Sequence, residues 1–197
     1  MNLSKNEISN IDVLEKVNFK ELKELNLNRN EISNINILEK VNFKELKELD
    51  LSDNNIKYIN VLGKVKFEKL EKLALYLNNI TDINVLEKAN FKELKELYLT
   101  SNYIKDINVL EKVKFQKLEI LQLSSNKISD IEILEKVNFK ELKKLYLARN
   151  NISDISVLKQ VSFPQLEMID LGNNKISQSE KDLMIFKMKN KIKDFWI

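Results

Sequence analysis

One asparagine recurs at an interval of 24 residues along the whole chain. The 197-residue sequence keeps this spacing without an insertion or a deletion. Self-similarity at a fixed period of about 20 to 50 residues is typical of a solenoid, in which each unit packs only on its neighbours. We therefore predict one elongated domain. The repeated residues are Asn6, Asn30, Asn54, Asn78, Asn102, Asn126, Asn150 and Asn174.

The front of each unit has the pattern of a short strand. Leu94, Leu97 and Leu99 show its Leu-x-x-Leu-x-Leu arrangement, in which the last two leucines point to the same face of a strand. Successive strands are expected to stack about 4.8 Å apart as a parallel sheet. The asparagine three residues after the last leucine ends the strand. Its amide can bond backbone groups of its own unit and of the neighbouring unit.

The back of each unit is predicted to be a short helix of one to two turns. Asn108 stands three residues before Glu111, which is the spacing of a capping box. Gly63 and Lys159 break this box in two units, where shorter helices are expected. The same box recurs at Asn36/Glu39, Asn84/Glu87 and Asp12/Glu15. Phenylalanines at one position of the unit are expected to fill the back of the core: Phe19, Phe43, Phe67, Phe91, Phe115, Phe139 and Phe163.

The pattern LxxLxLxxNxIxxIxxL resembles the leucine-rich repeat family, and NNISDISVL at residues 150–158 is similar to its internalin-like branch. The resemblance covers essentially the whole chain, with a unit of 24 residues. It implies an α/β leucine-rich-repeat solenoid, a curved right-handed superhelix with a concave parallel β-sheet and short helices on the convex side. The repeats are expected over residues 1–176, with about eight strands and a truncated first unit.

Two columns of charged residues alternate in sign from one unit to the next. Stacked neighbours face each other, so opposite charges attract along each column. We interpret the columns as fixing register and solubility, with a binding role as the alternative. One column runs Lys47, Glu71, Lys95, Glu119, Lys143, Glu167, and the other runs Glu45, Lys69, Glu93, Lys117, Glu141.

The C-terminal residues 177–197 depart from the repeat and are predicted to form a capping helix and a final strand. Ser177 and Glu180 have capping-box spacing, and residues 194–197 are expected to return as the strand. An amphipathic membrane or partner helix is the alternative, because five lysines lie between Lys181 and Lys193. The apolar residues at helical spacing are Leu183, Met184, Phe186, Met188 and Ile192.

At the opposite end, Leu3 already takes the place of the last leucine of a strand. Either a poorly capped edge or a fragment of a longer protein is expected there. A sheet made by stacking has open edges, and such edges invite pairing with another chain.

The composition offers little for catalysis. The chain contains no His and no Cys, which removes the commonest general base, many metal ligands and the thiol nucleophile. Its two glycines cannot make a phosphate-cradling loop. We predict no enzyme, no cofactor and no metal site. Stacked aspartates could hold Ca²⁺, but a turn role is preferred for Asp82, Asp106, Asp130 and Asp154.

The charge balance argues against nucleic acid as the partner. The 33 Lys and Arg residues are interleaved with 30 Asp and Glu residues rather than gathered on one face. No apolar run is long enough to span a membrane, for which about 18 residues are needed. The absence of cysteine and of a signal segment favours a cytoplasmic location, which is otherwise unknown.

Function is expected where the repeat varies, in the columns around the end of each strand. Tyrosine and arginine, which dominate interface energetics, concentrate there. Random surface variation is the alternative interpretation, because strands accept tyrosine readily. The predicted partner-binding residues on the concave face are Asp50, Asp53, Tyr76, Leu77, Tyr98, Tyr103, Gln122, Tyr146 and Arg149.

The sequence thus predicts a non-enzymatic protein–protein interaction module that binds a protein or peptide on its concave face. One alternative is a recognition domain cut from a larger kinase, ligase or surface-anchored protein. Another is a structural repeat that assembles through its edges. A monomer is expected, with edge-to-edge self-association as the alternative.

Overall fold

The computed structural model describes residues 1–188 and 192–197, and the side chains of residues 1–185 and 192–197. Its strands form one parallel sheet in the order β1 to β8 along the chain. The strands are β1 (Glu24–Asn26), β2 (Glu48–Asp50), β3 (Lys72–Ala74), β4 (Glu96–Tyr98), β5 (Ile120–Gln122), β6 (Lys144–Tyr146), β7 (Met168–Asp170) and β8 (Asp194–Trp196).

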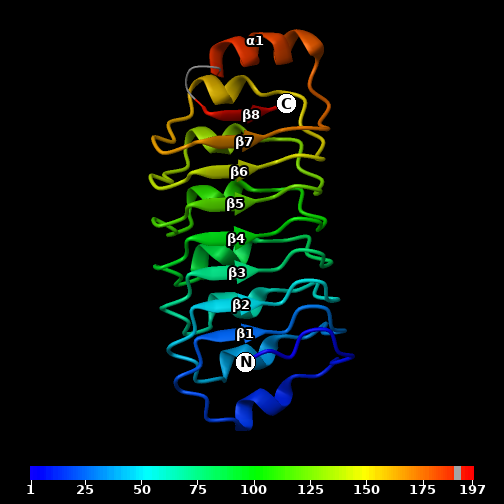
Figure 1. The fold of residues 1–197 in the computed structure, drawn as a ribbon, viewed down its shortest axis with the longest axis vertical. Helices are drawn as coiled ribbons and strands as arrows, with labels where there is room; N and C mark the ends of the chain where they lie inside the picture. The colour runs from blue at the N-terminus through cyan, green and yellow to red at the C-terminus, as the bar shows by residue number, and fades with distance from the viewer. Residues whose placement is uncertain (189–191) are drawn as a thin grey trace.

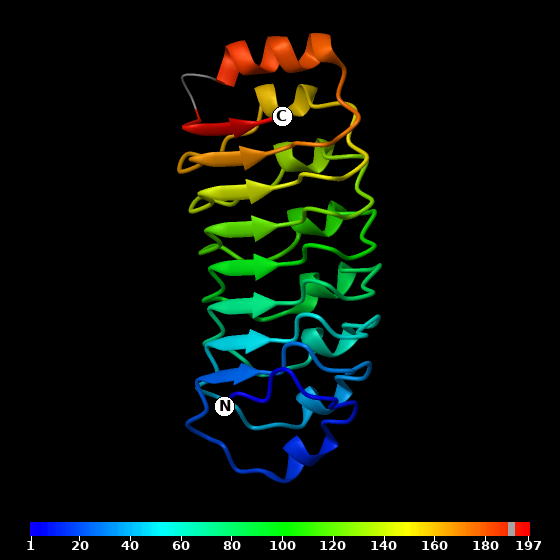
Figure 2. The same ribbon diagram turned by 45° about the vertical axis from the view of Figure 1, so that its right-hand side comes forward.

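A short 3₁₀ helix precedes each of β1 to β7. These helices are η1 (Asp12–Lys16), η2 (Asn36–Glu39), η3 (Asn60–Gly63), η4 (Asn84–Lys88), η5 (Asn108–Glu111), η6 (Glu132–Glu135) and η7 (Ser156–Lys159). Figure 1 shows the strands stacked one above another from the N-terminal to the C-terminal end, and Figure 2 shows the helices along the side opposite the sheet. The chain therefore forms a leucine-rich-repeat solenoid, as the sequence predicts.

The sheet has the register that the 24-residue period demands. Leu25 pairs with Leu49 and Leu49 with Leu73, and the same offset continues to Ile169 in β7. Each of β1 to β7 buries its central residue, so one continuous column of aliphatic side chains runs behind the sheet. At the N-terminal end, Asn2 bridges Asn26 and the Leu3 N–H donates to the Asn26 carbonyl at 2.8 Å.

The phenylalanine column fills the back of the core, with one exception. Phe43, Phe67, Phe91 and Phe115, each in the segment between a 3₁₀ helix and the following strand, are fully buried. Phe19 is 40% exposed, so the prediction that it fills the core is wrong. It belongs to the first coil, and in this structure no preceding coil covers it.

The asparagine ladder links each coil to the one before it. The Asn102 Nδ2 donates to the carbonyls of Leu75 and Leu99 at 2.9 and 3.1 Å, and its Oδ1 accepts the Ile80 N–H at 3.0 Å. Leu75 and Ile80 belong to the preceding coil. The ladder asparagines from Asn30 to Asn150 are buried. Asn6 is exposed, and its side-chain amide donates to the carbonyls of Leu3 and Ser4 within its own turn.

The helices on the back of the solenoid are not closed by the predicted capping box. Helix η5 is a 3₁₀ helix whose N-cap position is Ile107, with no side-chain cap hydrogen bond. Asp106 instead accepts the Asn108 N–H at 2.7 Å. Units that lack the box keep helices of ordinary length, since η3 and η7 have 4 residues, as η5 does. The box prediction, and the shortening inferred from it, were wrong because this turn is made by the residue two positions before the helix.

The aspartate row has the turn role predicted for it. Asp82, Asp106, Asp130 and Asp154 each accept the backbone N–H two residues ahead, at 2.7–2.8 Å. The hydrogen bond from Ser156 lowers the pKa of the Asp154 carboxyl below its ordinary value. No group of three or more Asp or Glu side chains arranged to hold a metal is found among the described residues.

The alternating charges form ion pairs between neighbouring coils. Glu71 contacts Lys47 and Lys95, both at 2.7 Å, and these bonds lower the pKa of Glu71 to about 2. Further pairs join Glu45 to Lys69 at 2.6 Å, Glu93 to Lys117 at 2.6 Å and Glu119 to Lys143 at 2.7 Å.

The last coil is followed by helix α1 (Gln178–Met188), which lies across the C-terminal end of the stack (Figure 1). The Ser177 Oγ accepts the Glu180 N–H at 3.3 Å. Met184 is buried, whereas Leu183 is exposed. The side chains of Phe186 and Met188 lie outside the described part of the structure. Among the described residues, no helix has the length and apolar character that a bilayer span requires.

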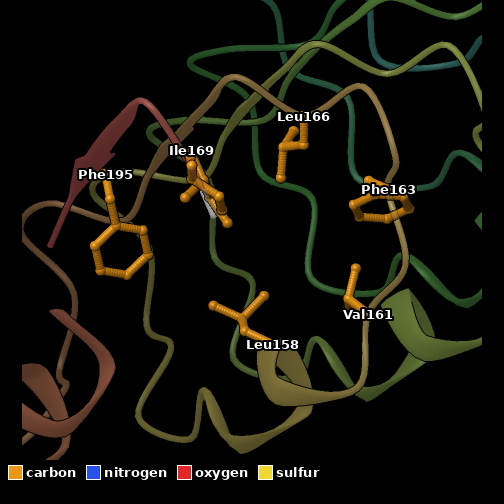
Figure 3. A pocket seen from close by; sticks show the side chains of 7 residues that line it. Leu158, Val161, Phe163, Leu166, Ile169 and Phe195 are labelled. Carbon is orange, nitrogen blue, oxygen red and sulfur yellow. The ribbon is translucent and has the colours of Figure 1, made fainter. Parts of the chain in front are cut away.

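Strand β8 then returns to the sheet and pairs in parallel with β7. A cavity of about 100 Å³ lies between this returning segment and the last coil. Figure 3 shows the apolar side chains that point toward it from both sides. They are Leu158, Val161, Phe163, Leu166, Ile169, Ile192 and Phe195.

Candidate functional site

The outward side of the sheet, here called the strand face, carries three columns of side chains. Two of these columns are variable columns that the sequence analysis identifies. One contains the residue directly after the central leucine of each strand, and the other contains the residue three positions after that leucine. The third column was missed, although strand alternation places the residues before and after the central leucine on the same face. Its members are Glu24, Glu48, Lys72, Glu96, Ile120, Lys144, Met168 and Asp194.

The candidate residues Tyr98, Gln122 and Tyr146 are brought together on this face. Tyr98 pairs in register with Gln122, and Gln122 with Tyr146. The row continues through Asp170 to Trp196 on β8. Trp196 is 60% exposed and was not predicted as a site residue.

The Tyr98 side chain is held in place by its neighbours. Its hydroxyl donates to the Glu96 Oε2 at 2.6 Å, and the Lys72 Nζ lies 5.8 Å from the ring centroid. Burial and the hydrogen bond to Glu96 raise the pKa of the Tyr98 phenol well above its ordinary value. Tyr98 therefore lies on the strand face as a neutral phenol whose hydroxyl is bonded to Glu96.

Asp50 and Tyr76 lie further toward the N-terminal end of the face. Asp50 Oδ1 accepts the Ser52 N–H at 2.9 Å and also bonds the Ser52 hydroxyl. The Tyr76 hydroxyl accepts a hydrogen bond from the Asn28 Nδ2 at 3.4 Å. Asp50 thus stabilises the turn after β2.

The other candidate residues lie on the turns that follow the strands, here called the turn edge. Asp53, Leu77 and Arg149 all have a positive φ, of 52°, 54° and 55°. Every turn in this column shares that left-handed conformation, which is uncommon outside glycine and asparagine. Asp53 also pairs with Arg29 at 3.5 Å.

An open groove of about 440 Å³ runs along the turn edge. Leu77 and Tyr103 are its large exposed side chains, at 48% and 45% exposed. The Lys127 Nζ lies 4.7 Å from the Tyr103 ring centroid. The structure thus divides the predicted site into a strand-face group and a turn-edge group. The first contains Asp50, Tyr76, Tyr98, Gln122 and Tyr146, and the second contains Asp53, Leu77, Tyr103 and Arg149.

Family models of the leucine-rich repeat match more than half of the chain. A model described as "Leucine Rich repeats (2 copies)" matches three overlapping stretches that together cover residues 92–183. A second model, "Leucine Rich repeat", matches residues 45–58. A search of curated proteins gave no significant match.

Solved structures with the same fold include bacterial and plant proteins. An internalin C2 from Listeria monocytogenes is 26% identical, with a TM-score of 0.79, over 100% of this chain and 77% of the other. A second Listeria monocytogenes internalin, inlF, is 25% identical, with a TM-score of 0.71, over 98% of this chain. This chain spans only 59% of that second internalin.

The ectodomain of the Arabidopsis thaliana receptor kinase GASSHO1/SCHENGEN3 is also similar. It was solved in complex with Casparian strip integrity factor 2. The two chains are 26% identical, with a TM-score of 0.61, over 79% of this chain and 19% of the receptor.

Leucine-rich repeat domains are generally protein-interaction modules and are typically not enzymes. The repeat sequence, the stacked parallel sheet and the family matches agree. The chain belongs to the leucine-rich repeat family and is similar to the internalins within it.

Proposed function

We propose that this protein is a non-enzymatic interaction module that binds a protein or peptide partner across its strand face. The row from Tyr98 through Gln122 to Tyr146 supports this proposal most directly. We place the centre of the interface on this row. The turn-edge residues Leu77 and Tyr103 would then form a second contact area beside it.

The chemistry of the row suits an interface. Tyrosine and tryptophan are enriched among the residues that dominate binding energy, because each offers a large contact area together with a polar group. Neighbouring strands lie about 4.8 Å apart, so Tyr98 and Tyr146 are separated by about 10 Å. A single partner segment can contact both rings. The bond from Tyr98 to Glu96 fixes one of them in advance, which reduces the entropy lost on binding.

The alternating charge columns beside the strands, here called the flanks of the sheet, are less suited to binding. The charges of Glu71, Lys47 and Lys95 already satisfy one another, and a partner would have to break these pairs. The similarity to internalins and to a receptor ectodomain that was solved with a bound factor also favours an interaction role.

The proposal is tested by comparing partner capture between matched variants. Immobilised wild-type protein is exposed to candidate partner proteins, and the affinity of each retained protein is measured by surface plasmon resonance. Tyr98→Ala and Tyr146→Ala are each expected to weaken binding about tenfold or more, which corresponds to about 1.4 kcal/mol. Thermal melting of each variant checks that the fold is intact.

Tyr58→Ala is the matched control. Tyr58 is 67% exposed and lies two residues before η3, away from the strand face. Its loss should leave partner affinity unchanged. Equal affinity of the Tyr98 and Tyr146 variants and the wild type, for every retained partner, would show that the strand face is not the binding surface.

A further inference from the structure

The strand face is acidic although the chain as a whole has a slight excess of basic residues. Its three outward columns contain two lysines, Lys72 and Lys144. The whole chain carries 33 basic and 30 acidic residues, so negative charge is concentrated on this face. The acidic residues of the three columns are Glu24, Glu48, Asp50, Glu96, Asp170 and Asp194.

These acids differ from the acids on the flanks in how they are neutralised. Glu45, Glu71, Glu93 and Glu119 each contact a lysine at 2.6–2.7 Å. Among the described residues of the strand face, Glu48 alone lies within ion-pair distance of a lysine, at 3.9 Å from Lys72. Apart from Glu48, the acids of the strand face have no lysine within ion-pair distance among the described residues, so their charges can act on an approaching molecule.

The acidic residues gather at the two ends of the face, and uncharged side chains occupy much of its middle. Glu24, Glu48 and Asp50 lie on β1 and β2, and Asp170 and Asp194 lie on β7 and β8. Glu96, in the middle, is already bonded by the Tyr98 hydroxyl. The uncharged side chains over β3 to β6 include Tyr76, Tyr98, Ile120, Gln122 and Tyr146.

The spacing of the two acidic ends sets a length for a partner segment. Five strand-to-strand steps separate β2 from β7, and at about 4.8 Å a step they amount to about 24 Å. An extended chain advances about 3.3 Å per residue, so about seven residues cover that distance. A segment that crosses the strands could therefore contact both acidic ends.

We infer that the partner presents an extended segment with cationic groups about 24 Å apart and with apolar residues between them. This inference rests on the proposed function and names the chemistry of the partner. Lysine or arginine at either end would meet the acidic ends of the face, and the apolar residues would pack on Tyr98, Ile120 and Tyr146. Such attraction also accelerates encounter and weakens with added salt.

Synthetic peptides test the inference directly. The first peptide has two lysines at each end, about seven residues apart, with alternating leucine and serine between them. The second replaces the lysines by glutamates, and the third keeps four lysines in one cluster at one end. None contains tryptophan, so Trp196, the one tryptophan of the chain, reports binding through its fluorescence. Titration calorimetry gives a second measure of affinity.

The lysine-ended peptide is expected to bind at least about tenfold more tightly than the glutamate-ended peptide at low salt. Because exposed charges are screened over about 10 Å at 0.1 M salt, this preference should fall steeply when the ionic strength is raised. The clustered peptide should bind more weakly than the lysine-ended peptide. Equal affinity of the lysine-ended and glutamate-ended peptides, or no binding of either, would overturn the inference.

Matched charge variants locate the contact. The double variant Glu24→Gln/Glu48→Gln should weaken binding of the lysine-ended peptide about fivefold or more and reduce its salt dependence. The control Glu21→Gln/Glu141→Gln removes two exposed charges from the flank and should leave binding unchanged. Equal effects of the two double variants would contradict a contact at the acidic end.

The tyrosine variants and the peptide titrations together distinguish failure of this inference from failure of the proposed function. If the tyrosine variants lose their natural partners while the peptides show no charge preference, the strand face binds a partner of different chemistry. If the tyrosine variants keep all their partners, the strand face is not the binding surface.

Discussion

At the scale of single residues, the buried asparagines link neighbouring coils through their side-chain amides. Each buried asparagine accepts an N–H from the preceding coil and donates to carbonyls of both coils, as Asn102 does with Ile80, Leu75 and Leu99. Truncating this side chain leaves those backbone N–H and carbonyl groups buried without a hydrogen-bond partner. Each buried unpaired group costs about 1–3 kcal/mol.

We therefore expect Asn102→Ala to lower the free energy of unfolding by about 3 kcal/mol. Urea denaturation monitored by circular dichroism measures the change. The control is Asn6→Ala, which alters an exposed asparagine whose side chain bonds only the carbonyls of Leu3 and Ser4, and it should cost less than about 0.5 kcal/mol. A loss at Asn102 no larger than that at Asn6 would show that the ladder contributes little to stability.

The ladder could be predicted from the sequence because one residue type repeats at one position. The conformation of the residue before it could not. Lys5, Arg29, Leu77, Ser101 and Asn173 all occupy this left-handed position, and none of them is glycine. This positive φ is imposed by the hydrogen-bonded asparagine that follows. Several residue types adopt it, so no single residue type in the sequence predicts it. For this reason Leu77 and Arg149 were placed on the same surface as Tyr98, although they lie on the turn edge.

At the scale of elements, the predicted helices exist, but their N-terminal turns have a different origin. A capping box needs a side chain at the N-cap, and here that position is an isoleucine in every unit, as at Ile107. Asp106, one residue earlier, makes the turn instead. The sequence spacing of Asn108 and Glu111 fits a capping box equally well, so spacing alone could not separate the two arrangements.

On the flanks of the sheet, the ion pairs of Glu71 with Lys47 and Lys95 make a pH-dependent contribution to stability. Its two lysine partners lower its pKa from 4.5 to about 2 in the folded state. Because the folded pKa lies below the unfolded one, this stabilisation is present above about pH 4.5 and is lost as the pH falls toward about 2. The side chain is 30% exposed, so solvent screening limits its value to about 0.5–1 kcal/mol.

Glu71→Gln should therefore lower the free energy of unfolding by about 0.5–1 kcal/mol at pH 7 and by progressively less below about pH 4.5. Urea titrations at pH 7, and at several values below about 4.5, measure this difference. Glu141→Gln, which removes an exposed charge from the neighbouring column, is the control and should change the free energy of unfolding at pH 7 by less than about 0.5 kcal/mol. If the difference between Glu71→Gln and the wild type stays constant down to low pH, the lysine pairs do not stabilise the fold.

At the scale of the whole molecule, the two ends of the solenoid differ. Val13 and Phe19 are exposed at the N-terminal end, whereas α1 and β8 cover the C-terminal end. The period predicts the stack, but it does not predict how β8 joins it. Ile169 pairs with Phe195, an offset that departs from the 24-residue spacing of the other strands. Trp196 could therefore not be aligned with Tyr146 and Asp170 from the sequence.

The C-terminal residues 177–197 are proposed to stabilise the solenoid by covering its last coil. Their removal would expose the edge of β7 together with Phe163, Leu166 and Ile169. Open strand edges and apolar patches promote association between chains. We expect a variant truncated after Ile176 to melt at a lower temperature and to associate more strongly with increasing concentration. Calorimetry and light scattering measure the two effects.

Two single substitutions at neighbouring positions of α1, made in the untruncated chain, test whether α1 stabilises the last coil without removing any residues. Met184 is buried in α1, and Ile185 beside it is exposed. Met184→Ala is expected to destabilise the protein by about 2–3 kcal/mol, and Ile185→Ala by less than about 0.5 kcal/mol. If Met184→Ala and truncation both leave the melting temperature unchanged, α1 is not a structural cap, and a partner helix becomes the better explanation of its lysines.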